Sequence, residues 1–101
     1  MTDDPMCCYL ANPIVSCRDE GDDGALLYNP DIDDAILINT TGRIIWKFMA
    51  KPHTFDEIRD HLASIIDSVS EGQIAKDLEQ FLKDLMPEFV SEVMPSEYGG
   101  I

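Results

Sequence analysis

Short apolar runs separated by acidic turns fill the first half of the chain. Residues 14–18, 25–28 and 35–38 are each too short for an ordinary helix, and Gly, Pro, Asp or Asn residues stand between them. Such runs are typical of β-strands joined by tight turns. The pattern predicts three strands in an antiparallel meander.

The second half of the chain changes to a helical spacing, with apolar residues three and four positions apart. The first predicted helix follows residues 39–41, all of which have side-chain oxygens that can cap a helix. Two further helices begin at Thr54 and Ser70, where Glu57 and Gln73 complete the spacing of a capping box. The predicted order is therefore β-β-β-α-α-α, an α+β fold in which a three-stranded antiparallel meander and a three-helix unit share one core.

The two ends of the chain show neither the alternation of a strand nor the spacing of a helix. We expect residues 1–12 to form a flexible N-terminal tail, residues 13–93 a single domain, and residues 94–101 a C-terminal tail. Within the domain, residues 89–93 are a candidate for a short closing strand after Pro87.

Composition narrows the classes of function. The chain has 101 residues, of which 45% are hydrophobic and 27% charged, as in one small globular domain. It has no apolar run of the roughly 18 residues that span a membrane, and its acidic N-terminus is unlike a signal peptide, so we expect a cytoplasmic protein. The net charge of -13 argues against nucleic acid as a partner, because phosphate binding needs Lys and Arg.

No arrangement of side chains predicts catalysis or a metal site. We expect His53 and His61 at the surface, and Cys7, Cys8 and Cys17 as reduced thiols, with Cys17 packed in a strand. A zinc site needs about four ligands, and the acidic turns lack the offsets of a calcium-binding loop. We therefore predict a binding module that is not an enzyme and has no cofactor.

The strand at residues 35–38 is unusual because it is apolar on both faces. A strand in a small antiparallel sheet normally alternates between a buried and a wet face. As the last strand of the meander it would also have an open edge, and an apolar edge beside a helix can accept a peptide as an added strand. Equally well, a terminus of the chain or a second copy could cover the second face.

These segments resemble the PqqD-like family, the peptide-recognition domains of ribosomal peptide maturation systems. The resemblance covers roughly residues 12–90. The matching stretches are NPIVSCRDE at 12–20, ALLYNPD at 25–31, ILINTTGRIIWKFM at 36–49, HTFDEIRDHL at 53–62 and IAKDLEQFLKDL at 74–85. Many members end with an apolar Gly-Leu-Ile or Gly-Leu-Val strand, where this chain has PEFV at 87–90.

The resemblance implies a winged-helix-like fold and a non-catalytic function. The leader segment of a precursor peptide would add to the strand at 35–38, in the groove beside the third helix, and be presented to a modifying enzyme such as a radical SAM maturase. The peptide-binding residues that it implies are Ile36, Leu37, Ile38, Ile74, Asp77, Leu78, Phe81 and Leu85.

Two other functions are compatible with the same pattern. A structural domain could pair the edge at 35–38 with a second copy of itself, which would give a homodimer. A winged-helix regulator would instead bind DNA, but the acidic charge makes this the weaker alternative.

Overall fold

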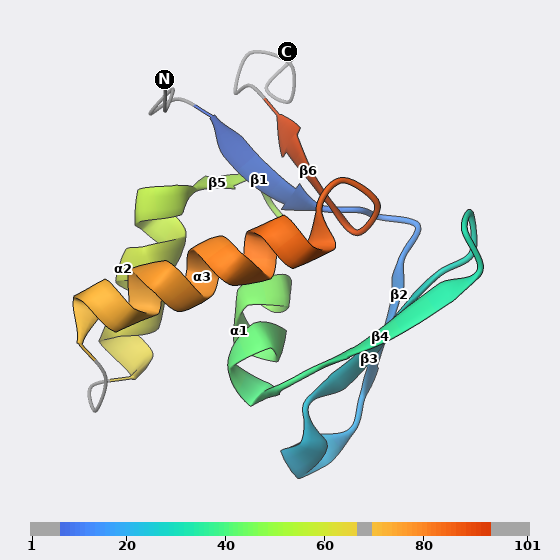
Figure 1. Ribbon diagram of the computed structural model, residues 1–101, viewed down its shortest axis with the longest axis horizontal. Helices are drawn as coiled ribbons and strands as arrows, with labels where there is room; N and C mark the ends of the chain where they lie inside the picture. The colour runs from blue at the N-terminus through green and yellow to red at the C-terminus, as the bar shows by residue number, and fades with distance from the viewer. Residues whose placement is uncertain (1–6, 67–69, 94–101) are drawn as a thin grey trace.

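The computed structural model describes residues 7–66 and 70–93 (Figure 1). The predicted tail residues 1–6 and 94–101 lie outside these ranges. Across the described residues, no helix combines the length and apolar character needed to cross a bilayer. The elements are β1 (Cys8–Ala11), β2 (Ser16–Asp19), the 3-10 turn η1 (Gly21–Asp23), β3 (Ala25–Asn29), β4 (Asp34–Ile38), α1 (Thr40–Phe48), β5 (His53–Thr54), α2 (Phe55–Ile65), α3 (Glu71–Leu85) and β6 (Val90–Val93).

The strands form two separate three-stranded antiparallel sheets. The meander has the order β2-β3-β4, and the second sheet has the order β5-β1-β6. Figure 1 shows β1 and β6 side by side near both termini, away from the meander. The meander followed by three helices confirms the predicted α+β, winged-helix-like fold.

Strand β1 corrects the prediction of a tail that extends to Asn12. Residues 8–11 pair with β6 from Cys8↔Val93 to Ala11↔Val90, and with β5 at two positions. This segment has no alternating pattern of its own, and its strand partners lie more than 40 residues away along the chain. Strand β6 shows that a closing strand does form after Pro87.

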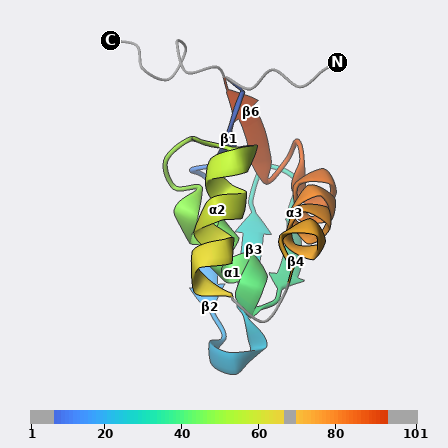
Figure 2. The same cartoon turned by 90° about the vertical axis from the view of Figure 1, so that its left-hand side faces the viewer.

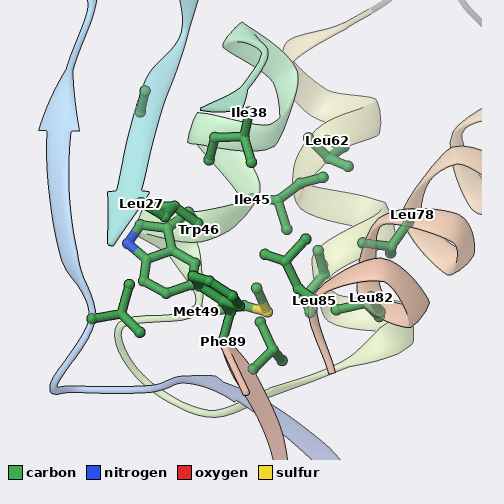
Figure 3. Close-up of a cluster of buried hydrophobic side chains, with 14 of the residues drawn as sticks. Leu27, Ile38, Ile45, Trp46, Met49, Leu62, Leu78, Leu82, Leu85 and Phe89 are labelled. Carbon is green, nitrogen blue, oxygen red and sulfur yellow. The ribbon is translucent and has the colours of Figure 1, made fainter. Parts of the chain in front are cut away.

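One apolar core joins the meander to the helices (Figure 3). Trp46 is buried in this core. Each fully buried large apolar side chain contributes roughly 1.5–3 kcal/mol to folding. The core residues labelled in Figure 3 are Leu27, Ile38, Ile45, Trp46, Met49, Leu62, Leu78, Leu82, Leu85 and Phe89.

The capping residues act largely as predicted. Asn39 Oδ1 accepts from the Gly42 N–H at 2.7 Å and so begins α1 immediately after β4. Thr54 and Glu57 form a complete capping box at the start of α2.

The predicted second capping box is only half formed. Ser70 Oγ accepts from the Gln73 N–H, but the Gln73 side chain donates to Asp77 Oδ1 at 2.9 Å. A complete box would need the Gln73 side-chain oxygen to accept from the Ser70 N–H, but the Gln73 amide instead makes a charge-assisted hydrogen bond to Asp77 one turn further along α3.

Several side chains differ in burial from the predictions. Cys8 is buried in β1, whereas Cys17 lies exposed in β2. Phe48 stacks between His53 and His61, with ring centroids 3.9 Å and 4.0 Å apart. Both imidazoles are therefore partly buried against α1 rather than fully at the surface.

Candidate functional site

Strand β4 is the outer strand of its sheet. It pairs with β3 through five positions, from Ala25↔Ile38 to Asn29↔Asp34. In the part of the chain that the structure describes, no strand pairs with the other edge of β4. Backbone N–H and C=O groups on such an edge can pair with a further strand.

The two faces of β4 have different surroundings. Ile38 is 6% exposed and Ile36 is half-buried, and both belong to the core side of the sheet. Leu37 points to the opposite face and is 63% exposed. Because β1 and β6 belong to the second sheet, neither of these terminal strands pairs with β4. A large apolar side chain is thus exposed at an open strand edge.

On the outer face of the meander, Leu37 is followed by residues of β3 and then of β2. Leu26 is the cross-strand partner of Leu37, and Arg18 is the partner of Leu26 on the next strand. A shallow open hollow of about 350 Å³ lies over this row and is lined by Arg18, Glu20, Asp23, Leu26 and Leu37. Leu26 and Arg18 could not be recognised as neighbours of Leu37 from the sequence, because their positions depend on the register of the three strands.

Helix α3 approaches β4 where the strand runs into α1. In the view of Figure 2, β4 is the strand of its sheet nearest to α3. A Cβ added to Gly42 would come within 2.9 Å of Phe81 Cε1 and 3.1 Å of Ile38 Cβ. Helix α3 is therefore close to the end of β4, with Gly42 of α1 lying against both Phe81 and Ile38.

The structure divides the α3 residues of the predicted groove into two groups. Ile74, Leu78 and Leu85 are buried in the core, so they hold the helix in place rather than form its surface. Asp77 is exposed and Phe81 is half-buried. The accessible part of the predicted site therefore consists of Leu37, Asp77, part of Phe81 and the backbone edge of β4.

Two contacts fix the position of the strand edge. Arg43 donates to Asp19 Oδ1 at 2.7 Å and to the carbonyls of Gly21 and Gly24, which ties α1 to the β2–β3 turn. Gly24 has φ +101, and a Cβ there would come within 1.8 Å of the Ile38 carbonyl oxygen. Only glycine permits this approach, which holds the end of β4 against the turn.

The Asp19 carboxylate forms an ion pair with Arg43 at this turn. The Gly21 backbone N–H donates to Asp19 at 2.8 Å and, with the Arg43 guanidinium beside it, lowers the pKa of this carboxyl. Asp19 thus stays ionised at neutral pH. Among residues 7–66 and 70–93, no group of three or more His, Cys, Asp or Glu side chains could hold a metal ion.

Comparison with known proteins gives a family and a shared fold. The chain matches the family model described as Coenzyme PQQ synthesis protein D (PqqD) over residues 24–88, more than half of its length. A solved structure of TbiB1 in complex with the TbiA(beta) leader peptide superposes with a TM-score of 0.64. That likeness has 22% sequence identity and covers 75% of this chain and 86% of TbiB1, and it shows a shared fold.

Among curated protein sequences, none is similar enough to this chain to count as a relative. The matched residues 24–88 include β3, β4, α1, α2 and α3, which together build the open edge and its neighbouring helix. The chain belongs to the PqqD family.

Proposed function

We propose that this protein is a non-catalytic binding module that captures the leader segment of a ribosomally made precursor peptide. The leader adds as an extra strand to the open edge of β4 and is presented to a modifying enzyme. The observation that carries this proposal is the edge of β4 with which none of the described strands pairs, with Leu37 63% exposed on one face and α3 beside it.

An added strand would meet three kinds of contact at this site. The β4 backbone would supply ladder hydrogen bonds, which give affinity without selecting a sequence. Side chains on one face of the added strand would lie beside Leu37, and those on the other face would point toward α3 and Phe81. These alternating contacts would supply the specificity.

The comparisons support peptide binding in general. Membership of the PqqD family and the fold shared with TbiB1, which was solved with a leader peptide, both favour peptide binding. For the partner we propose a radical SAM enzyme, and for the location the cytoplasm; both rest on the family resemblance and on the sequence.

Self-association through the same edge is the alternative that the structure also favours, because an open β4 can pair with a second copy. The mass of the protein in solution, measured over a range of concentrations, separates the two. A monomer at every concentration supports the peptide function, whereas a dimer that dissociates when leader peptide is added shows competition for one edge.

The proposed function is tested with leader peptides of precursors encoded beside the gene. Binding is measured by fluorescence anisotropy for each peptide and for versions methylated at alternate backbone nitrogens. Strand addition requires the N–H groups of one alternate set, so methylation of that set should abolish binding while methylation of the other set is tolerated. Equal tolerance of both sets, or no binding by any leader, would contradict the proposal.

A further inference from the structure

The flank of α3 beside β4 carries acidic side chains and no basic ones. Gln73, Asp77, Phe81 and Asp84 follow one another at spacings of four, four and three residues, so they form one stripe along the helix. Phe81 packs on Gly42 of α1, which lies beside Ile38 at the end of β4, and this contact shows which way the stripe faces. Asp77 and Asp84 are both exposed on it.

Neutral partners hold these two carboxylates. Gln73 Nε2 donates to Asp77 Oδ1, and Gln80 Nε2 donates to Asp84 Oδ1, each at 2.9 Å. An amide donor orients a carboxylate but does not neutralise it. The stripe therefore keeps two negative charges.

The basic residues of α3 lie on a different side of the helix. At 100° per residue, Lys76 and Lys83 fall ~140° and ~160° around the helix from Phe81, and ~80–120° from Asp77 and Asp84. Both lysines are exposed. They are therefore poorly placed to compensate Asp77 and Asp84.

The bases nearest the meander are already engaged with acids of the same region. Arg18 pairs with Glu20 at 2.6 Å, and Arg43 pairs with Asp19 at 2.7 Å. Lys47 lies 3.7 Å from Asp19 as well. These pairs lower the positive charge that the meander presents to a partner.

The start of β4 adds further negative charge. Asp31, Asp33 and Asp34 are exposed in and after the turn that precedes the strand. The Asp33 carboxylate accepts from the Tyr28 hydroxyl at 2.7 Å, which again leaves its charge in place. Acidic groups thus lie at the start of β4 as well as along the stripe of α3.

We infer that the segment captured by β4 is cationic and places Lys or Arg side chains toward Asp77 and Asp84. This inference rests on the proposed function. Alternate residues of an added strand face the same side and lie about 7 Å apart. Asp77 and Asp84 are separated by seven residues of helix, or ~10.5 Å along its axis. Long basic side chains two or four positions apart in the peptide can span this separation.

The negative charge of Asp77 and Asp84 would affect which peptides bind and how fast they associate. Opposite charges along an edge steer a peptide toward it, and like charges reject acidic segments. Exposed pairs of this kind contribute modestly to affinity, so the expected effect of removing both acids is roughly three- to tenfold.

The test selects peptides from a displayed library of random sequences on the full-length protein. Selection is repeated on Asp77→Asn/Asp84→Asn and on the matched control Lys76→Gln/Lys83→Gln, which changes two charges outside the stripe on the same helix. We expect peptides enriched in Lys and Arg from the wild type and the control, and loss of this enrichment with the Asp77/Asp84 variant. Circular dichroism confirms that each variant is folded.

A second measurement uses one selected peptide and a copy in which Gln replaces its Lys and Arg residues. The cationic peptide should bind the Asp77/Asp84 variant roughly three- to tenfold more weakly than the wild type, with a smaller dependence on salt. The Gln copy should bind both proteins equally. Selected peptides that are neutral or acidic, or a cationic peptide that binds the variant as well as the wild type, would overturn the inference.

The outcomes distinguish this inference from the proposed function. Peptides that require Leu37 but show no preference for positive charge would refute the cationic segment and leave strand capture standing. A library from which no peptide is enriched would refute both.

Discussion

Phe81 of α3 packs so closely on Gly42 of α1 that a methyl group on Gly42 would lie 2.9 Å from the Phe81 ring. The same methyl would lie 3.1 Å from Ile38 Cβ. This contact joins the third helix to the end of β4, and the separation of helix and strand depends on the missing side chain.

Gly42→Ala should therefore push Phe81 and Ile38 apart. Alanine normally stabilises a helix by up to ~1 kcal/mol relative to glycine, but crowding costs ~1–3 kcal/mol. We expect a net loss of about 1 kcal/mol in the free energy of unfolding, measured by urea denaturation. Gly72→Ala is the control, because nothing lies within 4 Å of its added Cβ, and it should be neutral or stabilising. Equal effects at both positions would contradict the close contact.

Leu37→Ser should remove the apolar contact at the open edge without unfolding the domain. An exposed side chain of this kind changes the free energy of unfolding by less than ~0.5 kcal/mol. We expect peptide binding to weaken about tenfold, since up to ~1 kcal/mol of cross-strand contact and the apolar area of Leu37 are lost.

Ile65→Ser provides the matched control, because Ile65 is also an exposed aliphatic residue, 49% exposed on α2. Binding by this control should equal that of the wild type. Anisotropy with the same labelled leader compares the two variants, and an equal loss in both would show that general hydrophobicity, rather than the β4 edge, drives binding. Ile38 is unsuitable for the test because it is buried.

The residues predicted on α3 should separate into core and surface when each is changed. Leu78 is fully buried, so Leu78→Ala should lower the free energy of unfolding by ~2–5 kcal/mol. Asp77→Asn should change it by less than ~0.5 kcal/mol. Thermal denaturation monitored by circular dichroism measures the change for both variants. A loss of stability in Leu78→Ala as small as that in Asp77→Asn would contradict the position of α3 in the core.

The capping box at α2 predicts a specific dependence of stability on pH. The Thr54 backbone N–H donates to Glu57 Oε1 at 2.9 Å and lowers the pKa of Glu57 below its ordinary value of 4.5. The unfolded chain therefore takes up this proton first as the pH falls. The stabilisation is fully present above about pH 4.5 and is lost as the pH falls through the lower, folded pKa.

Glu57→Gln keeps a side-chain oxygen for the Thr54 N–H but cannot titrate. The difference in the free energy of unfolding between wild type and Glu57→Gln should shrink as the pH falls below about 4.5. Urea denaturation at a series of pH values measures this difference. A difference that does not change with pH would show that the Glu57 charge does not stabilise the cap.

Local patterns predicted the elements around β4 because their signals lie within a few residues. Asn39 caps α1 directly after the strand, and Thr54 and Glu57 begin α2, so both helix starts can be recognised from the sequence. Strand β1 could not be recognised in the same way, because its pairing with β6 joins residues about 80 positions apart.

Periodicity also could not decide which apolar residues line a surface. Leu37 and Ile38 are neighbours of similar hydrophobicity, but the register with β3 exposes one and buries the other. Likewise, Leu78 and Phe81 both lie on the apolar stripe of α3, and only the contact with Gly42 places Phe81 beside β4. The two histidines that stack on Phe48 come from different elements, which no local pattern relates.

The most direct test of strand capture at β4 is an amide NMR titration of the labelled protein with leader peptides. We expect shifts to concentrate at residues 34–38 of β4 and at Asp77, Phe81 and Asp84 of α3, and β4 amides to become protected from hydrogen exchange. Shifts confined to the β5-β1-β6 sheet, or unchanged exchange at β4 with bound peptide, would contradict it.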